Sequence, residues 1–181
     1  MQLTVYHGTD LEKAISIMNT GFVFNANPRH WLGNGVYFYL EESLAKWWTT
    51  NPSKVFGCEI HNSRIIKAQI EIPDDKVLDL RNYETMKTTL LDFSDFFKTL
   101  IKSSSKAEID CNALTSAFFN FYKDRLHYEI IICDFRAENQ PYYELNPIIK
   151  TLNIQYSETQ ICVVPTGLKY ITKKEILDNA N

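Results

Sequence analysis

Short strand-like runs, spaced irregularly along the chain, constrain the possible folds more than any other feature. They alternate apolar and polar residues or are rich in β-branched and aromatic side chains, and they cover residues 3–7, 35–40, 65–72, 77–80, 128–133 and 159–164, with a further run at 168–171 that we expect to pair beside the last of them. Helical spacing of apolar residues occurs at residues 10–19, 41–50, 83–102 and 107–123. Because strands and helices do not alternate regularly, the pattern argues against a doubly wound parallel sheet and predicts an α+β fold with a mostly antiparallel sheet.

The size and composition of the chain suit one soluble domain. Its 181 residues can bury a sizeable core, so we predict a single domain over residues 1–181. Hydrophobic residues make up 45% and charged residues 23%, and the net charge of −3 lacks the basic excess of a dedicated nucleic-acid-binding protein. A small basic patch could still serve a nucleic-acid substrate. Neither a signal-peptide pattern nor a membrane-length apolar run occurs, so we predict a cytoplasmic protein with no membrane partner.

The spacing of the cysteines and histidines does not favour a metal site. The cysteines form no CxxC pair, and three of the histidines keep no ligand spacing with them or with one another. These residues are Cys58, Cys111, Cys133, Cys162, His30, His61 and His127. We therefore predict no metal, and unpaired thiols in a reducing compartment.

Two stretches, Tyr6-His7-Gly8-Thr9 and Gly33-Asn34-Gly35-Val36-Tyr37-Phe38, have the same construction. In each, a strand carries an imidazole or a phenol near a glycine, and a helical segment follows; after His7 the chain offers a turn and a helix N-cap at residues 8–10. A glycine in such a place lets a ligand approach the backbone closely. We therefore expect two neighbouring strands that open into one cleft. The alternatives are a histidine bonded to a nearby carbonyl and a plain turn at residues 33–35.

Alternation within the second stretch predicts which side chains face that cleft. Tyr37 and Tyr39 share one face of the strand, and Val36, Phe38 and Leu40 share the other. The apolar face is expected to meet the core, which leaves the tyrosines for the cleft. Neither a GxGxxG sequence after a strand nor a GxxxxGK(S/T) sequence occurs, so Rossmann and P-loop nucleotide sites are excluded.

Together with Ala45 and Trp48 on the following helix, the two stretches resemble the first two motifs of the ADP-ribosyltransferase superfamily. They fit its His-Tyr-Glu branch, which includes diphtheria-toxin-like and poly(ADP-ribose)-polymerase-like enzymes, and they are similar to small bacterial toxin-like members that begin with His-Gly-Thr or His-Gly-Ser. The helical middle and the late strand follow the family's order. The resemblance implies an ADP-ribosyltransferase-like split antiparallel β-sheet core with flanking helices.

The resemblance also implies NAD as the co-substrate and no metal. His7 would bind a ribose of NAD, the Gly8 backbone would hold the nicotinamide carboxamide, and Tyr37 would stack on the nicotinamide ring. A strained pose of the pyridinium and its ribose favours loss of nicotinamide, so positioning and electrostatics carry the catalysis. Arg29 and His30, in the loop before the second stretch, could reach the phosphates. The implied NAD-binding residues are His7, Gly8, Thr9, Arg29, Tyr37 and Trp48.

The third motif of the family, a glutamate on a late strand, departs from the usual pattern here. The strand register that we prefer places Gln160 in the glutamate position, with Glu158 two residues earlier on the same face. Gln160 could hold a ribose hydroxyl but supplies no carboxylate charge, which predicts transfer of single ADP-ribose units. If Glu158 takes the role instead, a catalytic set with His7 and Tyr37 is complete. A solvated carboxylate is the other interpretation of Glu158.

On this resemblance, the first hypothesis is an NAD-dependent mono-ADP-ribosyltransferase, toxin-like or used in bacterial conflict. It would transfer ADP-ribose to a protein or nucleic-acid acceptor and could be matched by a cognate antitoxin. With water as the nucleophile, the same fold would be an NAD glycohydrolase, and with an RNA 2′-phosphate acceptor it would be a phosphotransferase-like relative. A module that binds NAD or ADP-ribose without turnover is the alternative of a different class.

Overall fold

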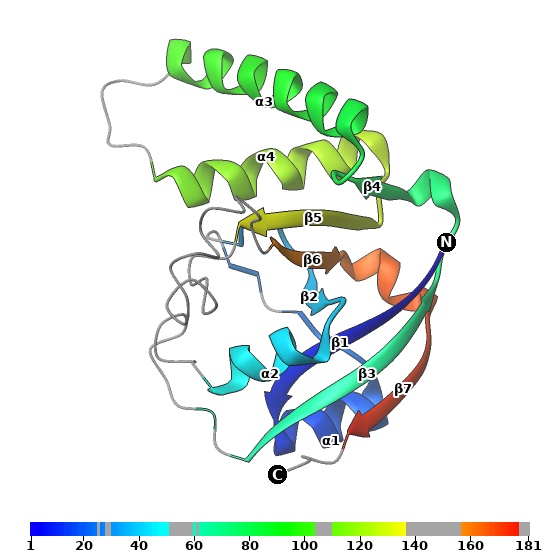
Figure 1. Cartoon of the computed structure of the whole chain (residues 1–181). Coiled ribbons are helices and arrows are strands. Elements are labelled where there is room, and N and C mark those ends of the chain that lie inside the picture. Colours follow the sequence, from blue (N-terminus) through cyan, green and yellow to red (C-terminus); the bar gives the residue numbers. More distant parts are fainter. Residues whose placement is uncertain are drawn as a thin grey trace, which may run out of the picture.

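The computed structural model describes residues 1–24, 26–27, 30–50, 60, 62–103, 110–136 and 157–177. Its elements are β1 (Gln2–Asp10), α1 (Leu11–Thr20), β2 (Val36–Tyr39), α2 (Glu42–Thr50), β3 (Ser63–Glu71), β4 (Val77–Asp79), α3 (Tyr83–Ser103), α4 (Cys111–Leu126), β5 (Ile130–Arg136), β6 (Ser157–Val163) and β7 (Ile171–Leu177), with short 3₁₀ turns at Asp74–Lys76 and Pro165–Tyr170. The helices flank a single sheet (Figure 1). The architecture is mixed α and β, which is compatible with the predicted α+β class.

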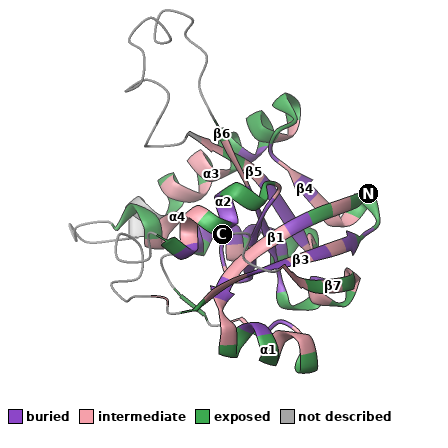
Figure 2. Ribbon diagram, turned by 60° about the horizontal axis from the view of Figure 1, so that its bottom comes forward, coloured by how far each residue is buried: buried purple, intermediate pink, exposed green. Residues whose placement is uncertain are grey.

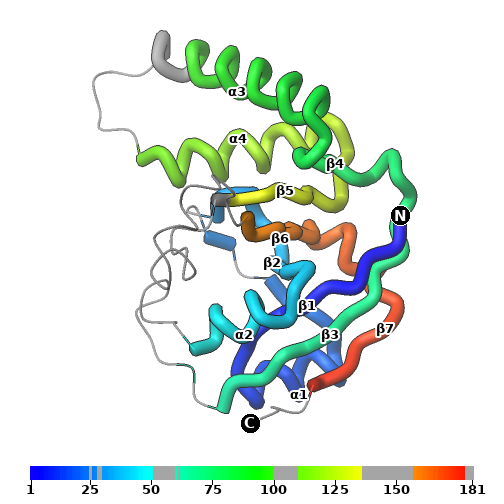
Figure 3. Tube along the Cα trace, viewed as in Figure 1, coloured from blue at the N-terminus to red at the C-terminus, as the bar shows by residue number. Residues whose placement is uncertain are grey.

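The sheet has seven strands in the order β4-β5-β6-β2-β1-β3-β7. Every neighbouring pair is antiparallel except β4 and β5, so the sheet is mixed but mostly antiparallel, as predicted. Three strands that are far apart in the sequence, β1, β2 and β6, lie side by side at its centre (Figure 3). The expectation that the first two strands are neighbours is therefore confirmed.

The ladder between β1 and β2 is short. These strands share one registered pair, Tyr6 with Tyr39, whereas β1 pairs with β3 along its whole length, Gln2–Asp10. The sheet thus consists of two halves, β4-β5-β6-β2 and β1-β3-β7, that meet at one short contact. The place where β1 and β2 part is also the place where the two glycine-flanked stretches of the sequence lie.

The two faces of the sheet pack against different helices. On one face, called the α1 face from here on, Val5, Phe38 and Ile161 belong to a core that Ala14 of α1 helps to close. On the other, called the α2–α4 face, α2 packs near β1, α4 covers β5 and β6, and α3 lies outside α4 (Figure 1). The buried residues are concentrated in the strands of the sheet, while the outer sides of the helices are exposed (Figure 2). Each fully buried aliphatic or aromatic side chain stabilises the fold by about 1.5–3 kcal/mol.

Local sequence explains where α1 begins and ends. The Asp10 side chain caps the helix by accepting a hydrogen bond from the backbone N–H of Lys13. Gly21 ends it with φ 92°, a conformation that suits glycine, and its N–H donates to the carbonyl of Ile17. Both signals were expected from the sequence.

The structure corrects two expected boundaries. The expected turn at Gly8 and Thr9 is part of β1, because β3 continues the backbone ladder as far as Asp10. Helix α4 begins at Cys111 rather than at residue 107, because the Asp110 side chain caps the helix there by accepting hydrogen bonds from two backbone N–H groups. The first difference arises from pairing with a distant strand, and the second from a local cap at Asp110.

The place of the last strand was wrongly expected. Residues 168–171 lie mostly in the 3₁₀ turn Pro165–Tyr170, and β7 pairs with β3 at the far edge of the sheet instead of beside β6. Strand propensity within a short segment carries no information about which strand will be its partner.

Candidate functional site

The residues expected to form the three motifs lie on three consecutive strands. His7 is on β1, Tyr37 is on β2, and Glu158 and Gln160 are on β6. These strands neighbour one another in the order β1, β2, β6. The tertiary structure therefore assembles segments that are separated by most of the length of the chain.

His7 joins the first two of these strands through its side chain. Its Nδ1 atom lies 2.8 Å from the main-chain oxygen of Tyr37. Because a carbonyl oxygen only accepts, Nδ1 carries the proton and donates, and Nε2 of the neutral ring is left as an acceptor. Within the described residues, Nε2 has no hydrogen-bond partner. The interpretation of a histidine bonded to a carbonyl is thus confirmed, but that carbonyl belongs to the second motif and leaves a ligand-binding nitrogen available.

Aromatic rings hold the imidazole in this orientation. Phe22 meets it edge-on at 5.4 Å between ring centroids, and Phe38 lies at 5.6 Å. Burial lowers the pKa of His7, the hydrogen bond to Tyr37 acts in the opposite direction, and the positive charge of Lys13 adds a smaller lowering. His7 is therefore neutral at pH 7, as a hydrogen-bond acceptor must be.

Gly8 lets helix α2 lie directly on β1. A Cβ atom at this position would be 2.5 Å from the carbonyl oxygen of Ala45 and 2.6 Å from Cγ2 of Thr49, closer than real contacts allow. Ala45 is itself fully buried. The glycine and the alanine that contribute to the family resemblance are therefore the two small residues of one helix–strand contact.

The turn before β2 holds Tyr37 by its hydroxyl group. Gly33 has φ 78° and the Tyr37 hydroxyl donates to its carbonyl oxygen at 2.9 Å. The same hydroxyl accepts a hydrogen bond from the N–H of Leu32 at 2.9 Å. Burial raises the pKa of Tyr37 well above its usual value, so the phenol stays neutral and can both donate and accept. The turn lies earlier than the expected residues 33–35: it is closed by the hydrogen bond from the N–H of Gly33 to the carbonyl of His30 at 2.9 Å, and a bend at residues 34–35 follows it. This segment, called the turn before β2 from here on, fixes the phenol ring.

The predicted alternation along β2 is confirmed. Val36 and Phe38 enter the core of the α1 face, while Tyr37 and Tyr39 pack with the clusters of the α2–α4 face. Tyr39 is buried, so the tyrosine face is not wholly exposed. It contributes instead to a set of packed aromatic rings.

That set, the aromatic group, consists of Trp31, Tyr37, Tyr39 and Trp48. Trp31 lies with its ring centroid 5.6 Å from that of Tyr37 and stacks on Trp48 at 6.1 Å. Trp48 is also 6.0 Å from Tyr39. The sequence identified Tyr37 and Trp48 as candidates but not Trp31, because it lies in a segment without periodicity. The feature of the sequence that could have identified Trp31 is its place, as a bulky aromatic residue, just before the glycine-rich residues 33–35.

Gln160 is buried, and its carbonyl group is already occupied. The indole N–H of Trp31 donates to Oε1 of Gln160 at 2.9 Å, and the side chain is 5% exposed. Since an indole can only donate, this bond determines which end of the amide faces Trp31. The amide therefore offers a donor, and not an acceptor, to any other partner.

The Glu158 side chain lies on the same face of β6 as Gln160, near Tyr39. Burial, and after it the charge of the Glu158 carboxylate, raise the pKa of Tyr39 well above its usual value. Glu158 is half-buried. The Glu158 carboxylate on β6 is therefore close enough to Tyr39 on β2 for the two groups to interact electrostatically.

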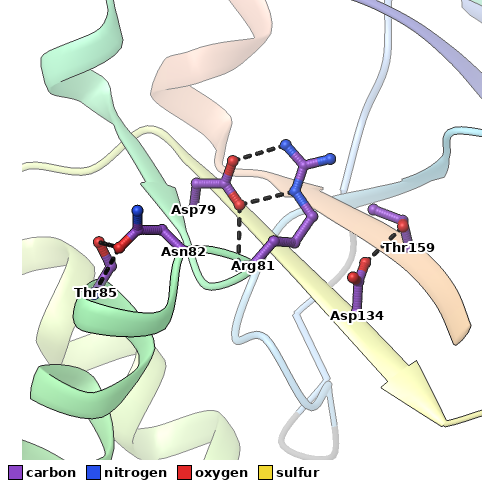
Figure 4. Close-up of polar contacts among 6 residues, drawn as sticks. All are labelled: Asp79, Arg81, Asn82, Thr85, Asp134 and Thr159. Carbon is purple, nitrogen blue, oxygen red and sulfur yellow. Dashed lines mark hydrogen bonds and ion pairs between the residues drawn. The ribbon is translucent and has the colours of Figure 1, made fainter.

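Two separate polar pairs lie at the ends of β4, β5 and β6. Thr159 donates to the Asp134 carboxylate of β5 at 2.6 Å, and Asp79 of β4 accepts from Arg81 at 2.8 and 2.7 Å (Figure 4). The hydrogen bonds from Arg81 lower the pKa of Asp79, against the effect of partial burial. The bond from Thr159 to Asp134 joins β6 to β5 beside Glu158, whereas the bonds from Arg81 to Asp79 lie within the segment that ends β4.

The candidate side chains are divided between the two faces of the sheet. Tyr37, Glu158 and Gln160 lie on the α2–α4 face, where Trp48 of α2 joins them. His7 lies on the α1 face and reaches β2 where the backbone ladder between β1 and β2 has ended. The site is therefore not a pocket on one face, but two sets of residues that meet at the parting of two strands.

The three remaining candidates are Thr9, Arg29 and His30. Thr9 follows His7 on the same face of β1, and it is 6% exposed, so its side chain has little surface for a ligand. Arg29 lies outside the described residues. His30, its neighbour, packs at 5.1 Å from Tyr37, and burial followed by the charge of Lys123 lowers its pKa.

Metal-ligating and thiol groups were also located. Within the described ranges, no group of three or more His, Cys, Asp or Glu side chains is placed to hold a metal ion. Cys111, Cys133 and Cys162 are free thiols, and burial raises the pKa of Cys162 to about 12 and that of Cys133 to about 11. Cys58 lies outside the described residues. In the part of the chain that is described, no helix combines the length and the apolar character needed to cross a membrane.

No family model matches this chain. The chain is similar to an uncharacterised protein, MJ0359, of Methanocaldococcus jannaschii, with 35% identity over 85 residues. The matched stretch covers 46% of this chain and 40% of that protein, so the chain spans less than half of its relative's length. The function therefore has to be argued from the site.

Proposed function

We propose that this protein is an NAD-dependent mono-ADP-ribosyltransferase with a split antiparallel core of the ADP-ribosyltransferase type. The observation that carries the proposal is the His7 imidazole, whose Nδ1 is held by the Tyr37 carbonyl while Nε2 stays available as an acceptor. That bond joins the two stretches on which the family resemblance rests, residues 6–9 and 33–38. The single registered pair between β1 and β2, and the strand order β1-β2-β6, support the same proposal.

In the proposed reaction, no side chain of the protein has to form a covalent bond to the substrate. The bond between C1′ of the ribose and the nicotinamide nitrogen breaks, and its electron pair neutralises the pyridinium. The acceptor nucleophile then forms the new bond to C1′ and loses its proton. Positive charge develops on the ribose in the transition state, so the protein has to orient the ribose, hold the departing ring and place negative charge nearby.

His7 and the aromatic group would meet the first two requirements. Nε2 of His7 would accept a hydrogen bond from a ribose hydroxyl, which a neutral imidazole can do. A flat cationic ring binds well against aromatic faces, and both Tyr37 and Trp48 are half-buried members of the aromatic group. The hydroxyl of Tyr37 is engaged in the turn, so its ring, and not its hydroxyl, would face the ligand.

Glu158 is the better candidate for the third residue. The Gln160 carbonyl is engaged by Trp31, and the amide that remains has no negative charge to oppose an oxocarbenium ion. Glu158 supplies a carboxylate on the same face of β6. We therefore assign charge stabilisation to Glu158, the alternative to the preferred register that placed Gln160 in the glutamate position, and we assign the positioning of Trp31 to Gln160.

The proposal is tested with NAD labelled in its adenylate part, cell lysate, and the variants His7→Ala and Glu158→Gln. Glu71→Gln, at the exposed end of β3, is the matched control. Wild type and Glu71→Gln are expected to label a macromolecule and release nicotinamide. Glu158→Gln should lose at least about 100-fold in transfer while it still binds NAD, and His7→Ala should lose binding as well.

Other outcomes of this experiment separate the alternatives. Nicotinamide release without a labelled macromolecule would indicate an NAD glycohydrolase, and binding without turnover would indicate a binding module. Nuclease or protease sensitivity of the label would tell a nucleic-acid acceptor from a protein. Toxicity on expression that His7→Ala removes would support a toxin role, for which a cognate antitoxin stays a prediction. The proposal fails if wild-type protein neither binds nor consumes NAD.

Gln160→Ala tests the division of roles on β6. We expect a loss of transfer of at most about tenfold, because the variant loosens Trp31 but keeps the carboxylate. A change in tryptophan fluorescence should accompany it. A loss as large as that of Glu158→Gln would instead make Gln160 the third catalytic residue.

A further inference from the structure

Helix α4 holds the turn before β2 through two hydrogen bonds, one to the backbone N–H and one to the backbone carbonyl of Asn34. Asn120 Oδ1 accepts a hydrogen bond from the N–H of Asn34 at 2.7 Å, and Lys123 Nζ donates to the carbonyl oxygen of Asn34 at 2.6 Å. Residues three apart lie on the same side of a helix, so these two side chains form a matched acceptor and donor. No sequence motif pointed to either of them.

Lys123 is unusual in this place because its charge is buried. Its side chain is 6% exposed, and desolvation lowers its pKa. It forms no ion pair with any residue that the structure describes, so the carbonyl of Asn34 is the polar partner of a buried ammonium group. Since an apolar side chain would fill the same space without the cost of desolvation, the bond to the turn is what this lysine contributes.

The turn itself leaves little room for adjustment. Gly33 has positive φ, and a Cβ atom there would lie 2.7 Å from Asn120 Oδ1. Its carbonyl accepts from the Tyr37 hydroxyl at 2.9 Å and from the Cys162 thiol at 3.8 Å. The position of α4 therefore determines that of the turn, and the turn determines that of the Tyr37 ring.

We propose that Asn120 and Lys123 are positioning residues for the NAD site, which act through Asn34 on Tyr37 and the rest of the aromatic group. This inference rests on the proposed function. Neither side chain touches the reacting atoms. Their role is to couple helix α4 to the second motif, so that NAD meets a preformed wall of aromatic rings and does not have to order it.

Amide hydrogen exchange tests this positioning without NAD. Asn120→Leu removes the acceptor and Lys123→Met removes the donor, and in both variants the amides of residues 32–38 should exchange about tenfold faster. The amides of β3 should be unchanged. Ser116→Ala, a buried substitution on the same helix, is the matched control and should leave residues 32–38 unaffected. Equal acceleration over β3 and the turn would indicate general destabilisation and overturn the inference.

Steady-state kinetics of the full chain test the consequence for NAD. Both variants should raise KM for NAD about tenfold and change kcat by less than about threefold, because a displaced binding wall weakens substrate and transition state alike. Asn120→Asp keeps an acceptor oxygen for Asn34 and should return KM to within about threefold of wild type.

Two results would overturn the inference in this second experiment. One is an unchanged KM in variants whose turn exchanges faster, and the other is an Asn120→Asp variant that is no better than Asn120→Leu. If wild-type protein consumes no NAD, the proposed function fails and with it the role in an NAD site. The exchange result then still decides whether α4 positions the turn.

Discussion

The first motif (residues 6–9) and the second motif (residues 33–38) are held in place by different kinds of contact. The first belongs to β1, which is paired with β3 over all of Gln2–Asp10. The second belongs to a strand of four residues and to a turn that depends on side chains from distant parts of the chain. Asn120, Lys123 and Cys162 contact this turn from 86, 89 and 129 residues further along.

This difference separates two sources of rigidity. A motif within a long backbone ladder tolerates changes elsewhere, because its hydrogen bonds belong to its own strand and the neighbouring one. A motif in a turn is only as well ordered as the side chains that hold it. Changes in α4 should therefore loosen the second motif alone, while the first responds to α2, which lies on Gly8.

Gly8→Ala has the largest expected effect on stability. The added Cβ would displace α2 from β1, because it would come within 2.5 Å of the Ala45 carbonyl oxygen, and we expect a loss of about 3 kcal/mol in the free energy of unfolding. Urea denaturation measures it. Gly21→Ala is the control. Apart from its chain neighbours, no described residue has an atom within 4 Å of the added Cβ, so the strain of φ 92° alone costs about 1 kcal/mol. Equal losses in the two variants would contradict the tight contact between β1 and α2.

Tyr37→Phe should destabilise the second motif by a smaller amount. It removes the hydroxyl that serves both Gly33 and Leu32, and the lost bonds should lower the free energy of unfolding by about 2 kcal/mol. Tyr6→Phe, in the first motif, removes a hydroxyl that bonds to none of the described residues, and it should cost less than about 0.5 kcal/mol. If thermal unfolding shows the same loss for both, the hydroxyl of Tyr37 does not hold the turn.

His7 and His30 should make stability decrease as the pH is lowered. Burial lowers the pKa of both below the usual 6.5, so the unfolded chain takes up protons at a higher pH than the folded protein does. Stability is then complete well above pH 6.5 and decreases as the pH falls through that value towards the folded pKa values.

Urea unfolding at several pH values on both sides of 6.5 measures this slope. His7→Asn, which can still donate to the Tyr37 carbonyl, should make the slope shallower by the contribution of the first motif. His30→Asn should do the same for the segment before the second motif. A slope that neither variant changes would contradict the burial of the two imidazoles.

Ser116→Ala should have the smallest effect, and of opposite sign. The Ser116 hydroxyl is buried in α4 and has no hydrogen-bond partner within the described residues. Its removal should stabilise the protein by about 0.5 kcal/mol, since alanine also favours the helix. Differential scanning calorimetry measures the change. A destabilised variant would indicate that the hydroxyl is bonded after all.

Local signals were sufficient for the elements other than β7 and for the two faces of β2. The Asp10 cap and the Gly21 stop mark the ends of α1, and alternation alone separates Phe38, which enters the core, from Tyr37. These features depend on the period of a strand and on the hydrogen-bonding needs of helix ends, which a few neighbouring residues determine. Sequence reasoning is reliable where the physics is local.

Pairings between distant segments could not be read in this way. The partner of β7 was wrongly expected, and the bond from Trp31 to Gln160, which joins residues 129 apart, had no signal in the sequence. The register preferred for the third motif made Gln160 the catalytic candidate, but periodicity could not show that its carbonyl was already engaged. Such contacts depend on which surfaces meet when the elements pack.

By itself, the sequence determined the helices, every strand except β7, the alternation along β2, and the two glycine-flanked stretches from which an NAD site is proposed. Only the tertiary structure decided that β1 and β2 meet at one registered pair, that His7 and Tyr37 lie on opposite faces, and that α4 holds the turn of the second motif. The physical reason is the range of the interactions. Periodicity and capping act over a few residues, whereas the site is assembled by hydrogen bonds between residues that only folding brings together.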